Sequence, residues 1–159
     1  MNNHYLTFFI GKNQFCIPAE KVVEINRNAD FTRVPGAPEA IKGILNLRGQ
    51  LIVAFDMSSL LGVVSEQDLS EAVSIIVQVD SSQISLLVDK VGDILALSAS
   101  TFENPPSNFP VHIRHAVVGA HKLADSLLIV IDPNLFIKHL TGNASIPASV
   151  DVLPLHHQT

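Results

Sequence analysis

The feature that most constrains this fold is an internal repeat, because two copies of one unit must bury their apolar faces in compatible ways. When one half of the chain is shifted onto the other, Gly43 falls on Gly119 and Asp56 falls on Asp132. The apolar run before each aspartate matches in the same register. Apolar runs often match by chance, whereas a glycine and an aspartate in one register do so far less often. The sequence therefore indicates two copies of one unit.

The segments that precede these runs repeat as well. Lys21–Ile25 lies over Lys90–Ile94, and the second copy carries an insertion relative to the first. The expected organisation is one domain, 1–142, made of copies near 5–62 and 73–142 whose ends are free to cross over, followed by a tail, 143–159. A core shared between the copies is the simplest way to bury both apolar faces.

The hydrophobic pattern predicts an all-β fold. Apolar runs bounded by turn residues predict ten short strands, five in each copy. They are Tyr5–Ile10, Gln14–Ile17, Val22–Ile25, Ile41–Leu47, Leu51–Phe55, Val73–Val79, Ile84–Val88, Val91–Leu97, Val117–His121 and Leu127–Ile131. A C-terminal helix is expected to begin at Asp132-Pro133 and to end at Gly142. Because closure removes sheet edges, we expect two pseudo-symmetric, five-stranded small β-barrels packed together, with short helices.

The central hairpin presents one arginine at a defined point. Strands Ile41–Leu47 and Leu51–Phe55 are joined at Arg48 and Gly49, and the glycine can take the positive φ that such a turn often requires. Asp56 then ends the second strand and can cap a short helical turn. An arginine held out between two buried strands has the character of a contact residue, although an ordinary solvated turn arginine is the alternative.

Composition excludes several classes of partner. The chain has only 10 Lys and Arg residues and a formal net charge of −5, so it lacks the basic footprint of a nucleic-acid-binding protein or of a protein that binds anionic membrane. No apolar run approaches the ~18–20 residues that a membrane span needs, so we expect no direct membrane insertion. A single cysteine, Cys16, excludes an internal disulfide and fits a reducing cytoplasm.

The residues that could carry chemistry have simpler structural explanations. Asp56 and Asp132 form a symmetric carboxylate pair, yet both begin helical turns, and capping accounts for them. His112 and His115 form an H-x-x-H pattern in a proline-rich segment without a third ligand close in sequence, as a metal site would need. Ser58 has no neighbouring base. We therefore expect no enzyme, no cofactor and no metal.

Five segments, taken in order, resemble the CheW family, the adaptor proteins of bacterial chemosensory arrays. They read FCIPAEKVVEI, VPGAPEAIKGILNLRG, LLVDKVGDILAL, ENPP and VVGAHKLADSLLIVID. The resemblance covers roughly Tyr5 to Leu140, and NLRG at 46–49 is its most specific part. It implies two five-stranded barrels about a pseudo-twofold axis. It also implies a non-catalytic adaptor, located in the cytoplasm at receptor arrays on the inner face of the membrane, that binds the regulatory domain of a CheA-type histidine kinase and the cytoplasmic tip of chemoreceptors.

The same resemblance implies a partner-binding site, formed by Arg48, Glu24, Val22, Asn46 and Gly49. Arg48 matches the family arginine implicated in partner contact, and Glu24 is its expected ion partner, since an arginine–carboxylate fork would aim the guanidinium. Val22 falls in the apolar surface used by the receptor. The alternative for Glu24 is a lone surface carboxylate. The alternative for Val22 is a core valine, because neighbouring residues of a strand face opposite sides.

Two departures from the family pattern leave the pathway open. Val53 stands where the family usually has a proline, and Ser58 stands where a basic residue is common. An adaptor specialised for a pilus-motility or biofilm pathway is therefore an alternative within the same fold. A small-ligand binding module or hydrolase that uses the cleft between the barrels is an alternative from another class, motivated only by the histidines and aspartates above.

Overall fold

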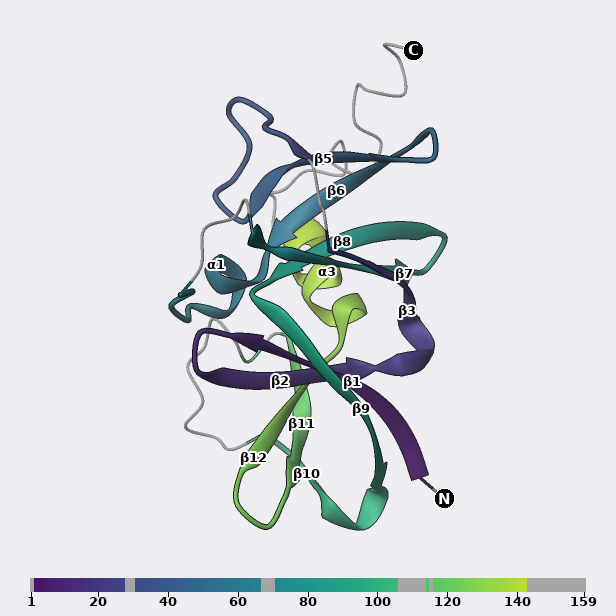
Figure 1. Cartoon of the computed structure of the whole chain (residues 1–159), viewed down its shortest axis with the longest axis vertical. Helices are drawn as coiled ribbons and strands as arrows, with labels where there is room; N and C mark the ends of the chain where they lie inside the picture. Colours follow the sequence, from purple (N-terminus) through teal and green to yellow (C-terminus); the bar gives the residue numbers. More distant parts are fainter. Residues whose placement is uncertain (1, 28–30, 67–70, 106–113, 115, 143–159) are drawn as a thin grey trace.

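The computed structural model describes residues 2–27, 31–66, 71–105, 114 and 116–142, and the statements below concern these residues. It is built mainly from two six-stranded sheets, one in the upper and one in the lower half of Figure 1. The all-β class expected from the sequence is confirmed.

Each sheet has its own strand order. The first sheet runs β10-β11-β12-β2-β1-β9, and the second runs β3-β7-β8-β6-β5-β4. The strands of the first sheet are β1 (Asn2–Ile10), β2 (Asn13–Pro18), β9 (Lys90–Ser98), β10 (Phe102–Glu103), β11 (Val117–Lys122) and β12 (Leu127–Ile131). The strands of the second sheet are β3 (Val22–Asn26), β4 (Phe31–Thr32), β5 (Ile41–Leu47), β6 (Gln50–Asp56), β7 (Val73–Val79) and β8 (Ser82–Val88). The helices are η1 (Ala19–Lys21), α1 (Met57–Leu61), η3 (Ala99–Thr101) and α3 (Pro133–Gly142).

The sheets combine strands from both copies of the repeat. The chain leaves the first sheet after β2, builds the second sheet from β3 through β8, and returns at β9. The copies are joined by four strand pairs: β12 with β2 and β6 with β8 are parallel, and β1 with β9 and β3 with β7 are antiparallel. The remaining pairs lie within one copy and are antiparallel. The repeat boundaries near 5–62 and 73–142 therefore do not coincide with the sheets.

The structure has twelve strands where the sequence pattern predicts ten. The additional strands, β4 and β10, have two residues each and hold matched places, since Phe31 pairs with Leu45 as Phe102 pairs with His121. Two-residue strands are too short for a hydrophobic pattern to reveal them. Within the described part of the chain, no strand pair joins the outer strands of either sheet, so each sheet is curled without full closure by backbone hydrogen bonds.

The repeated glycines are required by these short strands. A Cβ atom on Gly43 would lie 2.3 Å from the carbonyl oxygen of Thr32, and one on Gly119 would lie 2.3 Å from the ring of Phe102. No side chain fits at such distances, so the outer strand can approach β5 or β11 only where glycine leaves room. The same packing requirement in both sheets therefore explains why glycine recurs at positions 43 and 119.

The main core lies between the two sheets. It contains side chains from both, among them Phe8, Phe15, Ile17, Phe55, Ile75, Leu86, Ile131 and Phe136. Helix α3 lies between the sheets in Figure 1 and contributes Phe136, whose ring meets that of Phe55 edge to face. The shared core expected from the repeat is confirmed. Each sheet also keeps a smaller core of its own, around Leu45 and Ile52 in the second sheet and around Tyr5 and Leu128 in the first.

Both predicted caps are present. An oxygen of Asp56 accepts a hydrogen bond from the backbone N–H of Ser58 at 3.1 Å, and one of Asp132 accepts from Asn134 at 3.0 Å. The backbone N–H of each aspartate also donates to a matched carbonyl, that of Ala40 or Ala116. These bonds satisfy donors at the helix start that would otherwise lack partners. The Asp56 carboxylate therefore caps α1, and the Asp132 carboxylate caps α3.

Candidate partner-binding site

The β5–β6 hairpin turns through two residues that both have positive φ. Arg48 has φ of 52° and Gly49 has φ of 86°, which is the pattern of a type I′ turn. The glycine takes this conformation freely, whereas a residue with a Cβ loses roughly 1–2 kcal/mol in it. The oxygen of the Asn46 side chain accepts a hydrogen bond from the backbone N–H of Gly49 at 3.0 Å. The turn predicted from the sequence is confirmed, with Arg48 at its tip.

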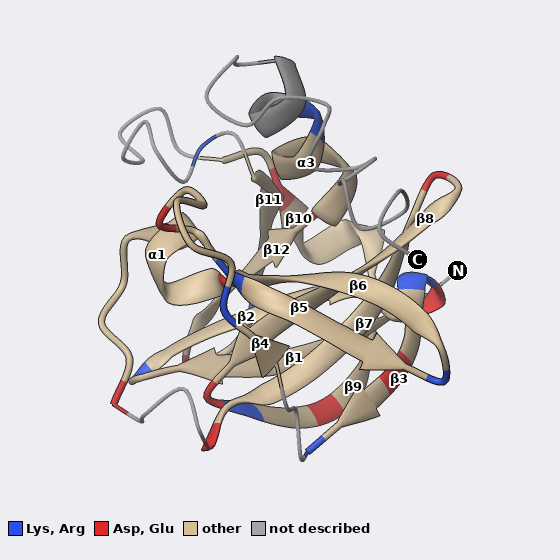
Figure 2. Ribbon diagram, turned by 90° about the horizontal axis from the view of Figure 1, so that it is seen from above, with Lys and Arg blue, Asp and Glu red and all other residues tan. Residues whose placement is uncertain are grey.

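The guanidinium of Arg48 donates to the carboxylate of Glu24, so the expected ion pair is present. Glu24 lies on β3, an outer strand of the second sheet, while the hairpin lies on the other side of β7 and β8 in the strand order. The sheet curls enough to bring the hairpin end beside β3, as Figure 2 shows. The pair thus connects two parts of the sheet that share no backbone hydrogen bond.

This ion pair leaves the arginine accessible. The Arg48 side chain is 71% exposed and that of Glu24 is 30% exposed. The hydrogen bond to Glu24, followed by the charge of that carboxylate, raises the pKa of Arg48 above its ordinary value. The guanidinium is therefore a permanent cation that one carboxylate orients while other donor N–H groups remain available. Such a group suits recognition of a partner's carbonyl or carboxylate oxygens.

The two valines before Glu24 face opposite ways. Val22 is half-buried and packs against the main core, whereas Val23 is 44% exposed. The pairing of β3 with β7 shifts between Val22 and Glu24, so Val23 is the extra residue of a β-bulge. A bulge cannot be recognised from residue alternation. The exposed valine beside the Arg48–Glu24 pair is therefore Val23, and a role for Val22 in a receptor-binding surface stays a prediction.

The structure thus brings four of the five predicted site residues into one cluster. Arg48, Gly49 and Asn46 form the hairpin end, and Glu24 reaches them from β3. Val22 belongs to the same strand as Glu24 but turns toward the core. The cluster offers a cation, an anion and a side-chain amide at the end of the β5–β6 hairpin. These groups can bind another protein surface.

Besides the buried Asp89, the sequence pattern did not reveal a buried titratable residue on β11, His121. It is 1% exposed, and its Nδ1 lies 2.8 Å from the hydroxyl oxygen of Thr101. The rings of Tyr5 and Phe102 meet it edge to face at 5.0 and 5.3 Å. Burial lowers the pKa of His121 and raises that of the Cys16 thiol to about 12. His121 falls at an inward-facing position of β11. The alternation of inward- and outward-facing positions along a strand was the sequence signal that could have revealed its burial.

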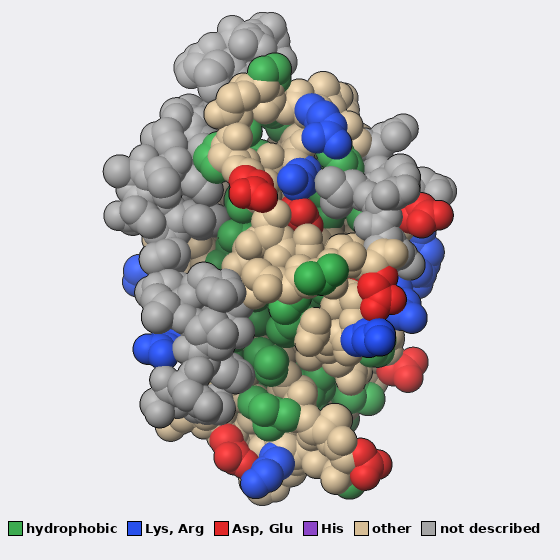
Figure 3. Space-filling model, turned by 90° about the vertical axis from the view of Figure 1, so that its left-hand side faces the viewer, with side chains coloured by type: hydrophobic (Ala, Val, Ile, Leu, Met, Phe, Trp, Pro, Cys, Tyr) green, Lys and Arg blue, Asp and Glu red, His purple; other side chains and the backbone are tan. Residues whose placement is uncertain are grey.

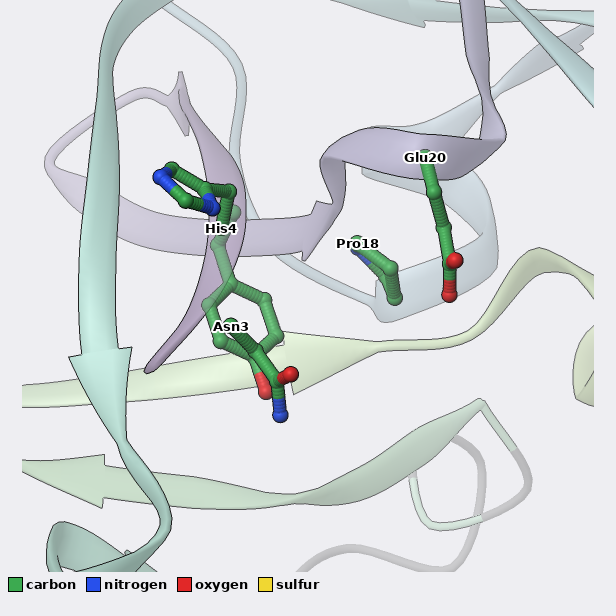
Figure 4. A pocket seen from close by; sticks show the side chains of 5 residues that line it. Asn3, His4, Pro18 and Glu20 are labelled. Atoms are coloured by element: carbon green, nitrogen blue, oxygen red, sulfur yellow. The ribbon is translucent and has the colours of Figure 1, made fainter. Parts of the chain in front are cut away.

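A shallow hollow lies elsewhere, beside the N-terminal end of β1. Figure 4 shows Asn3 and His4 on one side of it and Pro18 and Glu20 on the other, with Tyr5 also in its lining. It includes none of the five predicted site residues.

Among the described residues, no three His, Cys, Asp or Glu side chains gather as metal ligands would, and no helix is long and apolar enough to cross a membrane. His112 and His115 lie outside the described residues.

Apolar side chains also reach the surface. Those of large size are Val23, Val64, Ile94, Val118, Leu127 and Leu135. Figure 3 shows a face on which apolar side chains form an interrupted band, with charged side chains around it. Single exposed apolar side chains are ordinary on protein surfaces, so these residues do not by themselves mark a binding site.

Comparison with known proteins places these features in context. Residues 4–141 match the family described as the CheW-like domain. A chemotaxis protein CheW of Rhizobium meliloti is 35% identical over 64% of this chain, and the match covers 65% of that protein. The CheW of Bacillus subtilis is 23% identical over 89% of this chain and 91% of its own length. The crystal structure of the scaffolding protein TtCheW from Thermoanaerobacter tengcongensis superposes with a TM-score of 0.74 at 26% identity, covering 82% of this chain and 89% of that one.

Proposed function

The chain belongs to the CheW-like domain family, and from this premise we propose that it is a non-catalytic adaptor of bacterial chemosensory signalling. The observation that carries the proposal is the Arg48–Glu24 pair at the end of the β5–β6 hairpin, exposed on a family fold. The two aspartates that could have suggested acid–base chemistry serve as helix caps. What the site offers is an oriented cation for protein recognition.

We propose two partners, the regulatory domain of a CheA-type histidine kinase and the cytoplasmic tip of a chemoreceptor. Relatives that carry the name chemotaxis protein CheW, together with the solved scaffolding protein, support this choice. The proposed location follows from the partners, on the cytoplasmic side of the membrane at receptor arrays. The chain would contribute contacts there and no chemistry.

Coupling would arise from differential affinity. If the adaptor binds one receptor conformation more tightly than another, the population of that conformation rises when the adaptor is present. An adaptor bound to the kinase at the same time makes receptor state and kinase state thermodynamically dependent on each other. The main core, which contains side chains of both sheets, would hold the two sheets in a fixed relation while both partners are bound.

The test is binding by the purified chain. Titration calorimetry with the kinase regulatory domain and with a soluble receptor-tip fragment from the same organism should give saturable binding to both. The Arg48→Ala variant should lose binding to at least one of them, while Lys122→Ala, which removes an exposed cation near the end of the other hairpin, should bind as the wild type does. A wild-type chain that binds neither partner would contradict the proposal.

An adaptor for a specialised pathway remains a second candidate because of one contact. Ser58 stands where the family commonly has a basic residue. Its hydroxyl donates a hydrogen bond to the Asp56 carboxylate at 2.8 Å, so this side chain contacts the helix cap. Partner choice at this place would then differ from that of an adaptor with a free cation. Deletion of the gene followed by swimming, twitching and biofilm assays separates the candidates, and a defect in swimming chemotaxis alone would count against the specialised pathway.

A further inference from the structure

The β5–β6 and β11–β12 hairpins hold matched positions in the repeat, yet they turn differently. The β5–β6 strands are connected by two residues, Arg48 and Gly49, both with positive φ, whereas the β11–β12 strands are connected by four residues, 123–126. Among the described residues, only Arg48 and Asp80 combine a side chain with a positive φ, so the second turn has another conformation. Of these two hairpins, only β5–β6 has the turn with positive φ that carries Arg48.

The residue two positions before Arg48 and its match in the repeat distinguish the two hairpins. Asn46 accepts a hydrogen bond from the Gly49 backbone N–H at 3.0 Å. The matched residue in the other hairpin is Lys122, which has no acceptor and whose ammonium lies 3.9 Å from Glu103. Asparagine side chains commonly stabilise turns by such local bonds to the backbone. Asn46 thus supplies a bond that offsets the cost of the positive φ at Arg48.

The turn conformation decides where the Arg48 side chain points. The Cα–Cβ bond of a residue with positive φ leaves the backbone in a different direction from that of a residue with negative φ, so loss of the turn would redirect the guanidinium away from Glu24 on β3. We propose that Asn46 is a positioning residue: its side-chain oxygen fixes the turn and thereby aims Arg48, and it does not itself touch the partner. This inference rests on the proposed function of Arg48 as a contact.

The competing explanation is a direct contact, because Asn46 is exposed and its amide has two N–H donors. The variant Asn46→Asp separates the two roles, since it retains an oxygen acceptor for the Gly49 N–H and removes both donors. Asn46→Ala removes the acceptor and the donors together. Lys122→Ala is the matched control in the other hairpin.

The first measurement is affinity for the kinase regulatory domain and for the receptor-tip fragment. We expect Asn46→Ala to bind about fivefold more weakly, the equivalent of one ordinary hydrogen bond, for whichever partner depends on Arg48. Asn46→Asp should restore affinity to within about twofold of the wild type, and Lys122→Ala should match the wild type. If Asn46→Asp binds as poorly as Asn46→Ala, a direct contact explains the data and the proposal is wrong.

The second measurement needs no partner. The NMR signal of the Arg48 guanidinium should shift when Glu24 is replaced by Gln in the wild-type background. We expect the same response in the Asn46→Asp background and its loss in the Asn46→Ala background. An unchanged response in Asn46→Ala would overturn the positioning role. If the wild-type chain binds neither partner, the proposed function fails, while this signal still decides whether Asn46 aims Arg48.

Discussion

The two sheets share one scaffold but differ at their hairpin ends. In the second sheet Arg48 pairs with Glu24 and ties the β5–β6 hairpin to β3. In the first sheet the matched positions hold Ala124 and Asp93, which cannot form such a pair. The glycines and caps that build the fold occur in both copies, whereas an arginine at the hairpin turn occurs in one. The residues that the fold requires are thus repeated in both copies, whereas the candidate recognition group occurs in only one.

The small cores that each sheet keeps for itself differ as well. Where the first sheet has Tyr5, Cys16 and His121, the second has Ser74, Ser85 and Leu45 at the matched positions. The two serine hydroxyls lie 2.5 Å apart and satisfy each other within the second sheet. The first sheet instead encloses an imidazole between aromatic rings. Of these two small cores, only that of the first sheet therefore contains a histidine, and burial lowers its pKa.

The largest expected effect tests the shared scaffold. Gly43→Val and Gly119→Val should each lower the free energy of unfolding by ~4 kcal/mol, because the new side chain meets the neighbouring strand at 2.3 Å. Urea denaturation of both variants measures this. Gly49→Ala is the control, since nothing lies within 4 Å of its Cβ position and only its positive φ is strained. Similar losses for Gly49→Ala and Gly43→Val would contradict the packing explanation.

The next effect tests the difference between the hairpins. Arg48→Ala should weaken partner binding by ~3 kcal/mol, as truncation of a charged interface group does, while the free energy of unfolding changes by no more than ~0.5 kcal/mol. The exposed side chain and its surface ion pair explain the small effect on stability. Titration calorimetry and thermal melting should be run together. A much lower melting temperature with unchanged binding would make Arg48 a structural residue.

A smaller and symmetric effect is expected at the caps. Asp56→Ala and Asp132→Ala should each lower the free energy of unfolding by ~1 kcal/mol through loss of the bond to the backbone N–H of Ser58 or Asn134. Both variants should still bind the partners. Chemical denaturation with a parallel binding assay checks this, and a loss of binding without a loss of stability would assign these carboxylates a functional role.

The smallest effect at neutral pH concerns the core of the first sheet. Because burial lowers the pKa of His121 in the folded state, the unfolded chain binds its proton more readily, and stability falls as the pH drops through the ordinary histidine value near ~6.5. His121→Leu, which copies Leu45 of the second sheet, should remove that part of the pH dependence. Melting temperatures at about pH 8 and pH 5.5 test this. An equal drop in wild type and variant would assign the pH dependence to other groups.

Local sequence determined much of the fold. The match of Gly43 with Gly119 and of Asp56 with Asp132 revealed the repeat, and alternating or wholly apolar runs placed ten of the twelve strands. Asp132-Pro133 located the start of α3, and Gly49 located the β5–β6 turn. These features follow from backbone preferences and from hydrogen bonds between near neighbours, so a short window of sequence contains the information.

Only the tertiary structure decided how the copies share their strands. The crossing of the chain after β2 and again after β8 depends on pairing between segments far apart in sequence. The bulge that exposes Val23 and turns Val22 inward depends on the register of β3 against β7. The contact of Arg48 with Glu24 requires the second sheet to curl until its hairpin reaches its outer strand. Register and curvature arise from the packing of all strands together, which no local pattern specifies.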